Sequence, residues 1–446
     1  MKSPKSIYSS LILLGLPLVG SSVAQFSLTI IDAAMLGHYS PIALASAVIG
    51  GSFFFSFFIV GSGFSFAVVP LVAAYEAQKD ERQVRRITRM GLWMSLIYTL
   101  LVLICFLNSE KILLTIGQSA EISSLSQEYL RIMGFGLLPA LLVVTLRSYL
   151  TGLKHTQVIF LITLTGIPLK VFLNWIFIFG NLGISEMGIR GAAFTTTVVH
   201  LFMLFLLVFY IQKRLRSYLI FNGLWRLDYS YLIKIVKLGL PIGLTYFAET
   251  SLFTATAVMM GWLGTIQLAA HGITMQLAGL TFMFHVGMSQ AATTITGYAF
   301  GKNEGGEELQ RIGKATIMLT TAYAVLVMLI FLLFPDFLLA LFLDKSLLLS
   351  EQILSLAINL LMIAAAFHLV DGLQAAALGL LRGIQDVKTP SILALISYWF
   401  FGIGSGYLLG FELNLGSVGL WIGMVIGLTM AAVSLIWRYW SKTSFR

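Results

Sequence analysis

A series of long apolar runs constrains this chain more than any other feature. The runs recur from Leu11 to Trp437 and are about 20 residues long or longer, enough for a helix to cross a membrane. Lipid offers the backbone no hydrogen bonds, so a spanning run must be a helix or a strand of a closed barrel. The runs lack the polar alternation of barrel strands. With 11% charged residues and a mean hydropathy of +0.92, the sequence predicts an all-α integral membrane protein.

Twelve membrane-spanning helices are predicted. The first follows a basic start, has no small-residue cleavage site and continues past residue 30, so we expect it to be retained and not removed as a signal peptide. The predicted spans are 11–36, 45–75, 87–107, 125–149, 157–180, 188–212, 233–260, 267–299, 313–335, 354–381, 390–411 and 416–438.

The Lys and Arg residues between the spans predict the orientation. If the first terminus is cytoplasmic, 23 of the 28 Lys and Arg fall in cytoplasmic segments, Arg147 and Arg382 among them, and Lys170 falls within a helix. The opposite side then holds only Lys111, Arg131, Arg190 and Lys345. The positive-inside rule therefore predicts cytoplasmic termini. Because the net charge of +9 comes from short clusters and not from a basic soluble domain, we expect no nucleic-acid partner.

An internal repeat predicts two halves. Gly15-Leu16-Pro17 recurs as Gly239-Leu240-Pro241, and at the same offset Met35-x-Gly37 matches Met259-x-Gly261. The chain is therefore expected to form two six-helix lobes in the same orientation, residues 1–212 and 233–446, joined by a polar cytoplasmic linker at 213–232. Parallel repeats of this kind place a substrate path between the halves, near mid-membrane.

Three carboxylic acids, Asp32, Glu249 and Asp371, fall inside predicted spans. A carboxylate at this depth costs several kcal/mol unless it is paired, protonated or bound to a cation, so it normally serves function. Glu249 stands where the first half has Gln25, and Asp371 where it has Ala140. If both converge, they form a cation-binding site, for Na⁺ as a hard cation or for a proton. The alternative is that hydroxyls and amides satisfy each acid and merely lock helices together.

Asp32 has candidate partners in the fifth span, where Lys170 and Asn174 are one turn apart and share a helix face. Our hypothesis is an ion pair between Asp32 and Lys170. Such a pair would neutralise the acid of the first half and leave ion binding to the second. The alternative is that Lys170 extends towards a membrane interface.

Polar and aromatic side chains in the second half are candidates for a substrate cavity. His368 and Gln374 lie at i−3 and i+3 from Asp371, and aromatic faces suit flat cations. Ordinary packing is the alternative for each. The candidates are Tyr246, Gln276, Phe284, His368, Gln374 and Tyr398.

The sequence carries no enzyme signature. H-E-x-x-H, G-x-x-x-x-G-K-[ST] and G-x-S-x-G motifs are all absent, and Cys105 is the only cysteine. We therefore expect no enzyme activity and no cofactor beyond a coupling ion. Energy would come from an ion gradient or an external ATPase.

The chain resembles the multidrug and toxic compound extrusion (MATE) family, of the NorM type. The matching motifs extend over nearly the whole sequence. They are Gly15-Leu16-Pro17 with Gln25 and Ile31-Asp32-x-x-Met35-x-Gly37; Leu173-Asn174-Trp175; Gly188-x-x-Gly191-Ala192-Ala193; Gly239-Leu240-Pro241 with Glu249; Asp371-Gly372-x-Gln374; Leu381-Arg382-Gly383-x-x-Asp386; and Tyr398-Trp399-x-x-Gly402-x-x-x-Gly406-Tyr407.

This resemblance implies a V-shaped twelve-helix fold in a bacterial-type inner membrane. It implies a monomer that exports cationic or amphiphilic organic compounds in exchange for entering Na⁺ or H⁺. Glu249 and Asp371 match the family's C-lobe cation site, whereas Asp32 matches an N-lobe acid that acts with Asn174 and Thr196. Lys170 stands where relatives commonly have Asn, which argues against an N-lobe Na⁺ site, and Gly404 where a Pro is usual, which predicts a different bend.

Three alternatives remain open. A lipid-linked saccharide flippase of the same superfamily would need a more cationic cavity for a diphosphate than these acids provide. A membrane-embedded enzyme would need converging catalytic residues. A passive channel would conduct far faster than a carrier.

Overall fold

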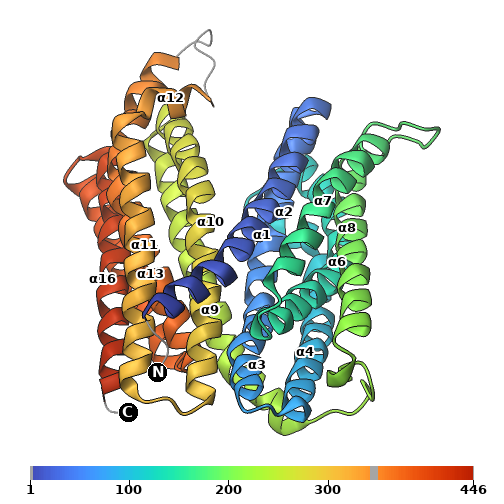
Figure 1. Cartoon of the computed structure of the whole chain (residues 1–446). Coiled ribbons are helices and arrows are strands. Elements are labelled where there is room, and N and C mark those ends of the chain that lie inside the picture. The colour runs from blue at the N-terminus through green and yellow to red at the C-terminus, as the bar shows by residue number, and fades with distance from the viewer. Residues whose placement is uncertain (1–3, 342–349, 445–446) are drawn as a thin grey trace. The chain divides into compact units, whose positions relative to one another are not determined.

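The structure is a computed structural model that describes residues 4–341 and 350–444. Lys2, Lys345 and Arg446, which contribute to the predicted orientation, lie outside these residues. All described elements are helical (Figure 1). They are α1 (Pro4–Tyr39), α2 (Pro41–Phe66), α3 (Val68–Ala77), α4 (Glu81–Leu107), α5 (Ser109–Thr115), α6 (Ala120–Gly152), α7 (Thr156–Phe177), α8 (Gly188–Arg214), the 3₁₀ helix η1 (Arg216–Tyr218), α9 (Tyr229–Leu263), α10 (Thr265–Gly301), α11 (Gly306–Leu333), α12 (Pro335–Ala340), α13 (Ser350–Gly383), α14 (Lys388–Ile396), the π-helical η2 (Ser397–Ile403), α15 (Gly404–Tyr407), the π-helical η3 (Leu408–Glu412) and α16 (Gly416–Ser444).

Each of the twelve predicted spans coincides with helix. Within the described residues, 11 helical stretches are long and apolar enough to cross a membrane. The remaining predicted span, 267–299, coincides with α10, which has 37 residues and carries many Thr, Ser, Gln and His side chains that lower its hydropathy. The span predicted at 45–75 is interrupted at Ala67, where α2 ends and α3 begins. The sequence does not predict the short helices α5 and α12.

Local sequence signals account for several helix starts. The Ser40 hydroxyl accepts a hydrogen bond from the Ala43 amide at 3.4 Å, and Pro41 occupies the first helical position of α2. The Asp80 carboxylate accepts one from the Gln83 amide at 3.0 Å at the start of α4. These side chains satisfy amides that have no partner within the helix.

The chain divides into two compact units, one formed by Gly20–Gly243 and the other by Met1–Val19 with Leu244–Arg446. These boundaries lie within α1 and α9, and the lobes at 1–212 and 233–446 with their linker remain a prediction. In the first unit α6 packs against α2, α4 and α8; in the second α13 packs against α10, α11 and α16 (Figure 1). The repeat pairs these helices in the same order, so each half is built around one central helix.

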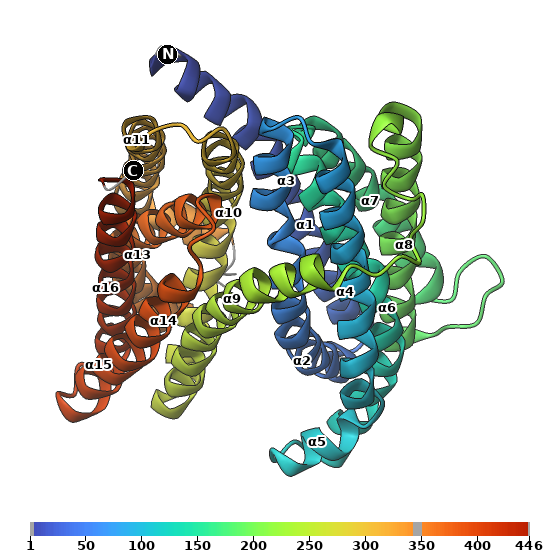
Figure 2. The same cartoon turned by 90° about the horizontal axis from the view of Figure 1, so that it is seen from below.

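The eleventh span contains two π-helical segments, η2 and η3. Figure 2 shows α14 and α15 beside α16, and Gly404 begins α15 between η2 and η3. A Cβ atom on Gly423 of α16 would lie 2.3 Å from the Gly406 Cα atom, so only glycine permits this close approach.

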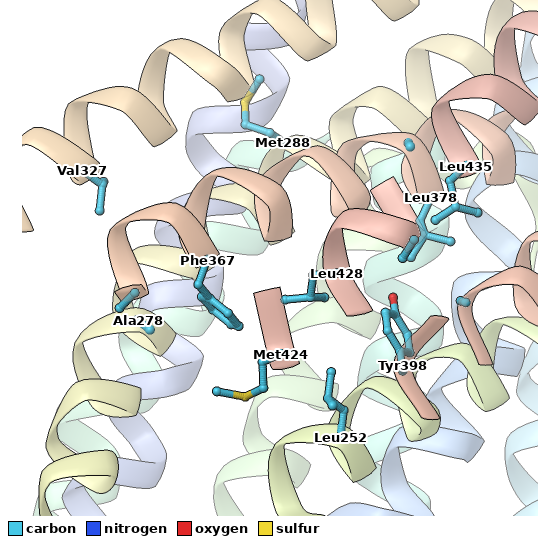
Figure 3. Close-up of a cluster of buried hydrophobic side chains, with 14 of the residues drawn as sticks. Leu252, Ala278, Met288, Val327, Phe367, Leu378, Tyr398, Met424, Leu428 and Leu435 are labelled. Atoms are coloured by element: carbon cyan, nitrogen blue, oxygen red, sulfur yellow. The ribbon is translucent and has the colours of Figure 1, made fainter. Parts of the chain in front are cut away.

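A buried apolar cluster holds Tyr398 of η2 in place. Leu252 of α9, Phe367 of α13 and Met424 and Leu428 of α16 belong to the same cluster. Figure 3 shows the Tyr398 ring beside Leu252, with its hydroxyl directed away from Leu252. The apolar packing thus fixes the ring and leaves the hydroxyl available for polar contacts.

Candidate functional site

Glu249 of α9 and Asp371 of α13 form the centre of the candidate site, here called the carboxylate pair. The Gln374 side chain, one turn after Asp371, donates from Nε2 to Glu249 Oε1 at 2.6 Å and to Asp371 Oδ1 at 3.2 Å. One amide nitrogen therefore joins two carboxylates from different helices. The structure brings together three residues that the sequence singles out.

Tyr398 orients this amide. Its hydroxyl donates to Gln374 Oε1 at 2.6 Å, which leaves the Gln374 nitrogen facing the carboxylates. Glu249 and Asp371 are 6% and 2% exposed, and both Gln374 and Tyr398 are fully buried. In the part of the chain that the structure describes, neither carboxylate forms an ion pair with Lys or Arg.

These features suit the binding of a small cation. Two buried carboxylates joined only by a neutral amide lose their hydration without gaining a contacting counter-charge, so a proton or a hard cation stabilises them. Among the described residues, no group of three or more His, Cys, Asp or Glu side chains could hold a metal ion. Ca²⁺ needs about six to eight oxygen ligands, which is more than two carboxylates supply.

A guanidinium group lies near the carboxylate pair. Arg382 of α13 donates from Nη1 to the Tyr246 hydroxyl at 2.6 Å, and its guanidinium carbon lies 4.4 Å from the centre of the Tyr246 ring. Tyr246 precedes Glu249 by one turn of α9. Arg382 lies in the last turn of α13, directly after the predicted span 354–381, and it is 7% exposed, so its side chain is buried within the protein.

The other cavity candidates lie in different surroundings. His368 faces His285 of α10, with their Nε2 atoms 3.1 Å apart. Phe284 stacks on Tyr323 of α11, with ring centres 3.7 Å apart, and both rings contact His285. Gln276 is exposed on α10. The predicted cavity residues therefore lie in three different places: around the carboxylate pair, in an aromatic and histidine cluster, and at an exposed position on α10.

The predicted polar site of the first half is also assembled around one acid. Lys170 Nζ lies 2.7 Å from Asp32 Oδ2, and Asn174 donates to Asp32 Oδ1 at 2.8 Å. Thr196 of α8 donates to Asp32 Oδ2 at 3.2 Å, and Lys170 also donates to Thr196. The Lys170 side chain is 2% exposed, so it does not extend towards an interface. Asp32 thus has a cationic partner within the protein.

Arg147 is a second arginine that the predicted orientation places in a cytoplasmic segment, yet it lies within α6. Its guanidinium donates to Gln25 Oε1 and, at 2.7 Å, to Ser21 Oγ of α1. Gln25 is the repeat equivalent of Glu249. Each half therefore has an arginine near this position of its first helix, but only the second half has a carboxylate there.

Comparison with known proteins identifies extensive similarity. The family model MatE matches residues 17–176 and 241–408. A probable multidrug resistance protein NorM of Agrobacterium fabrum is 40% identical over 439 residues, which cover 97% of this chain and 94% of that protein. A protein of the same name from Rhizobium meliloti is 40% identical, with coverage of 96% and 91%. The crystal structure of a eukaryotic MATE transporter is similar in fold, with a TM-score of 0.88, 18% identity and coverage of 99% and 98%.

Proposed function

The chain belongs to the MatE family, and on this premise we propose that it is a secondary active antiporter that exports cationic or amphiphilic organic compounds in exchange for Na⁺ or H⁺. It is a multi-pass membrane protein. The multidrug resistance names of its relatives support export of small organic molecules. The antiport mechanism rests on the carboxylate pair joined by Gln374.

The pair supplies a site where substrate and coupling ion compete. A cation that binds between Glu249 and Asp371 replaces the hydrogen bonds that the neutral Gln374 amide donates to both carboxylates. A positively charged drug gains from the same carboxylates. If the coupling ion and the drug favour different conformations, binding of one shifts the equilibrium away from the other.

The first half has a different role in this proposal. Lys170 provides Asp32 with a fixed positive charge, so the N-terminal site needs no Na⁺. Asp32, Asn174 and Thr196 then hold α1, α7 and α8 together. We further propose a monomer in a bacterial-type inner membrane with both termini cytoplasmic, in agreement with the distribution of Lys and Arg.

The alternatives receive less support. A lipid-linked saccharide flippase would bind a diphosphate, and a buried pair of carboxylates repels that anion. The relatives are named as drug-resistance proteins. The family consists of secondary transporters, which argues against an enzyme.

Transport in proteoliposomes tests the proposal. Purified protein is reconstituted, and movement of a fluorescent organic cation is followed under a Na⁺ gradient and, separately, a proton gradient. At least one gradient should drive transport, and Glu249→Gln and Asp371→Asn should each abolish the coupling. Gly51→Ala is a matched control because a Cβ atom on Gly51 meets no atom within 4 Å. Wild-type coupling in both carboxylate variants would remove the pair from the mechanism.

A further inference from the structure

The unit formed by Met1–Val19 with Leu244–Arg446, here called the C-terminal unit, has few buried charged side chains. Among its described residues, three Asp, Glu, Lys or Arg side chains are buried: Glu249, Asp371 and Arg382. Of the buried histidines, His285 and His368 contact each other through their Nε2 atoms at 3.1 Å, so at least one of these two rings is neutral. With all three ionised, the set carries one net negative charge.

Arg382 is held close to the carboxylate pair without being bound to it. Its hydrogen bond to Tyr246 and its position over the Tyr246 ring fix the guanidinium beside α9, one turn from Glu249. Its Nη2 atom is buried and has no hydrogen-bond partner among the described residues. Because water does not screen a buried charge, this guanidinium compensates a buried carboxylate over a longer range than a surface arginine would.

The unit formed by Gly20–Gly243, here called the N-terminal unit, differs in how its charged side chains are paired. There Arg147 bonds to the neutral Gln25, and the charge of Asp32 is already balanced by Lys170 at 2.7 Å. Asp32 therefore already has a contacting counter-charge. Among the described residues, Glu249 and Asp371 are the buried carboxylates without one.

We propose that Arg382 is a fixed counter-charge of the carboxylate pair and limits exchange to one monovalent cation per transport cycle. This inference rests on the proposed antiport function and adds its stoichiometry. One positive charge neutralises the set, whether it is Na⁺, a proton or a monovalent organic cation. Replacement of one by another moves no net charge across the membrane, so exchange of a monovalent drug is electroneutral. Arg382 acts through the carboxylates and is a positioning residue.

The test measures the drug gradient that a known ion gradient sustains. Purified full-length protein in proteoliposomes is given ethidium as the monovalent cation and a tenfold gradient of the ion that drives its transport. With zero membrane potential, one-for-one exchange sustains an ethidium gradient of about tenfold, and exchange of two ions sustains about a hundredfold. We expect the wild-type protein to give the tenfold value and to be insensitive to a potential imposed with K⁺ and valinomycin.

Removal of the counter-charge should change this ratio. Arg382→Gln leaves both carboxylates uncompensated, so we expect a gradient of about a hundredfold and transport that responds to membrane potential. Arg147→Gln removes the arginine that contacts Gln25 in the other unit and should retain the tenfold ratio. If Arg382→Gln does not transport, the stoichiometry is decided by the wild-type protein alone, from the ethidium gradient that it sustains and from the effect of membrane potential on its transport.

Failure of this inference is distinct from failure of the proposed function. Coupled wild-type transport that sustains about a hundredfold gradient, or depends on membrane potential, overturns the stoichiometry and leaves antiport intact. An active Arg382→Gln variant that retains the tenfold ratio does the same. The absence of wild-type transport under either ion gradient overturns antiport itself.

Discussion

Glu249 and Asp371, on helices α9 and α13, accept hydrogen bonds from the same nitrogen atom, Nε2 of Gln374. The two carboxylates are therefore linked without an ion, and a cation that binds between them would displace this link. This geometry gives the proposed competition a physical basis and leads to predictions for the residues around it.

Tyr398→Phe should strengthen binding of the coupling cation, because it loosens the amide that the cation displaces. The hydroxyl is the donor that turns Gln374 Oε1 away from the carboxylates, and its loss leaves a buried acceptor without this partner. An unsatisfied buried group costs about 1–3 kcal/mol in the ion-free state, so we expect roughly a tenfold higher cation affinity. Ion titrations of substrate binding measure the change. Trp399→Phe is the control, since its indole donates to Ser251 outside the set; equal effects of the two variants would contradict the assigned role of Tyr398.

Lys170→Met should destabilise the protein by about 3 kcal/mol, because it leaves Asp32 without its buried cationic partner. The double variant Asp32→Asn with Lys170→Met should recover most of this loss, since it removes both charges. Thermal unfolding in detergent measures stability, and proteoliposome transport measures function. Additive losses in the double variant would show that the pair is not energetically coupled.

Gly63→Val should prevent correct packing of α2 against α9. A Cβ atom on Gly63 would lie 2.3 Å from the Gly243 amide nitrogen, and the contacting atoms are backbone, which cannot move aside. Such overpacking costs about 1–3 kcal/mol or more. Gly51→Val on the same helix has open space around its Cβ position and should unfold like the wild type. Equal thermal midpoints for the two variants would contradict the close helix contact.

Much of the helical framework follows from the apolar runs, which predict each span to within a few residues. The repeat predicts that Gln25 and Glu249 occupy equivalent but chemically different positions. What pattern alone does not provide is the set of contacts between distant residues. Glu249, Gln374 and Tyr398 meet only because α9, α13 and η2 pack together, and no local spacing encodes that packing.

The distribution of Lys and Arg predicts the orientation of the chain but not the direction of a single side chain, and Arg382 is an example. The positive-inside rule uses residues near helix ends, and Arg382 is one residue from the end of α13. A long side chain at such a position can turn into the protein as readily as into solvent. The Tyr246 hydroxyl and ring determine its direction here, and Tyr246 is far away in sequence.

Acidification should destabilise the connection between α6 and α7. Burial lowers the pKa of His155, with Glu76 acting weakly in the opposite direction, and its Nδ1 lies 3.1 Å from the Tyr210 hydroxyl. The unfolded chain therefore takes up a proton first, and the stability present above the ordinary histidine pKa of 6.5 is lost as the pH falls below it. Thermal unfolding at about pH 7.5 and about pH 5.5 should show a smaller acid-induced loss for His155→Gln than for the wild type. His38→Gln, at an exposed site on α1, is the control; an unchanged loss in His155→Gln would exclude this group as the cause.

Competition for the carboxylate pair is tested most directly by equilibrium binding. A fluorescent monovalent organic cation is bound to the purified protein in detergent and titrated with NaCl or with acid, with choline chloride holding the ionic strength constant. The account predicts that Na⁺ or protons raise the apparent Kd of the dye without changing the number of sites, and that Glu249→Gln and Asp371→Asn reduce this effect. A dye affinity that neither ion changes, or displacement that persists unaltered in both variants, would contradict it.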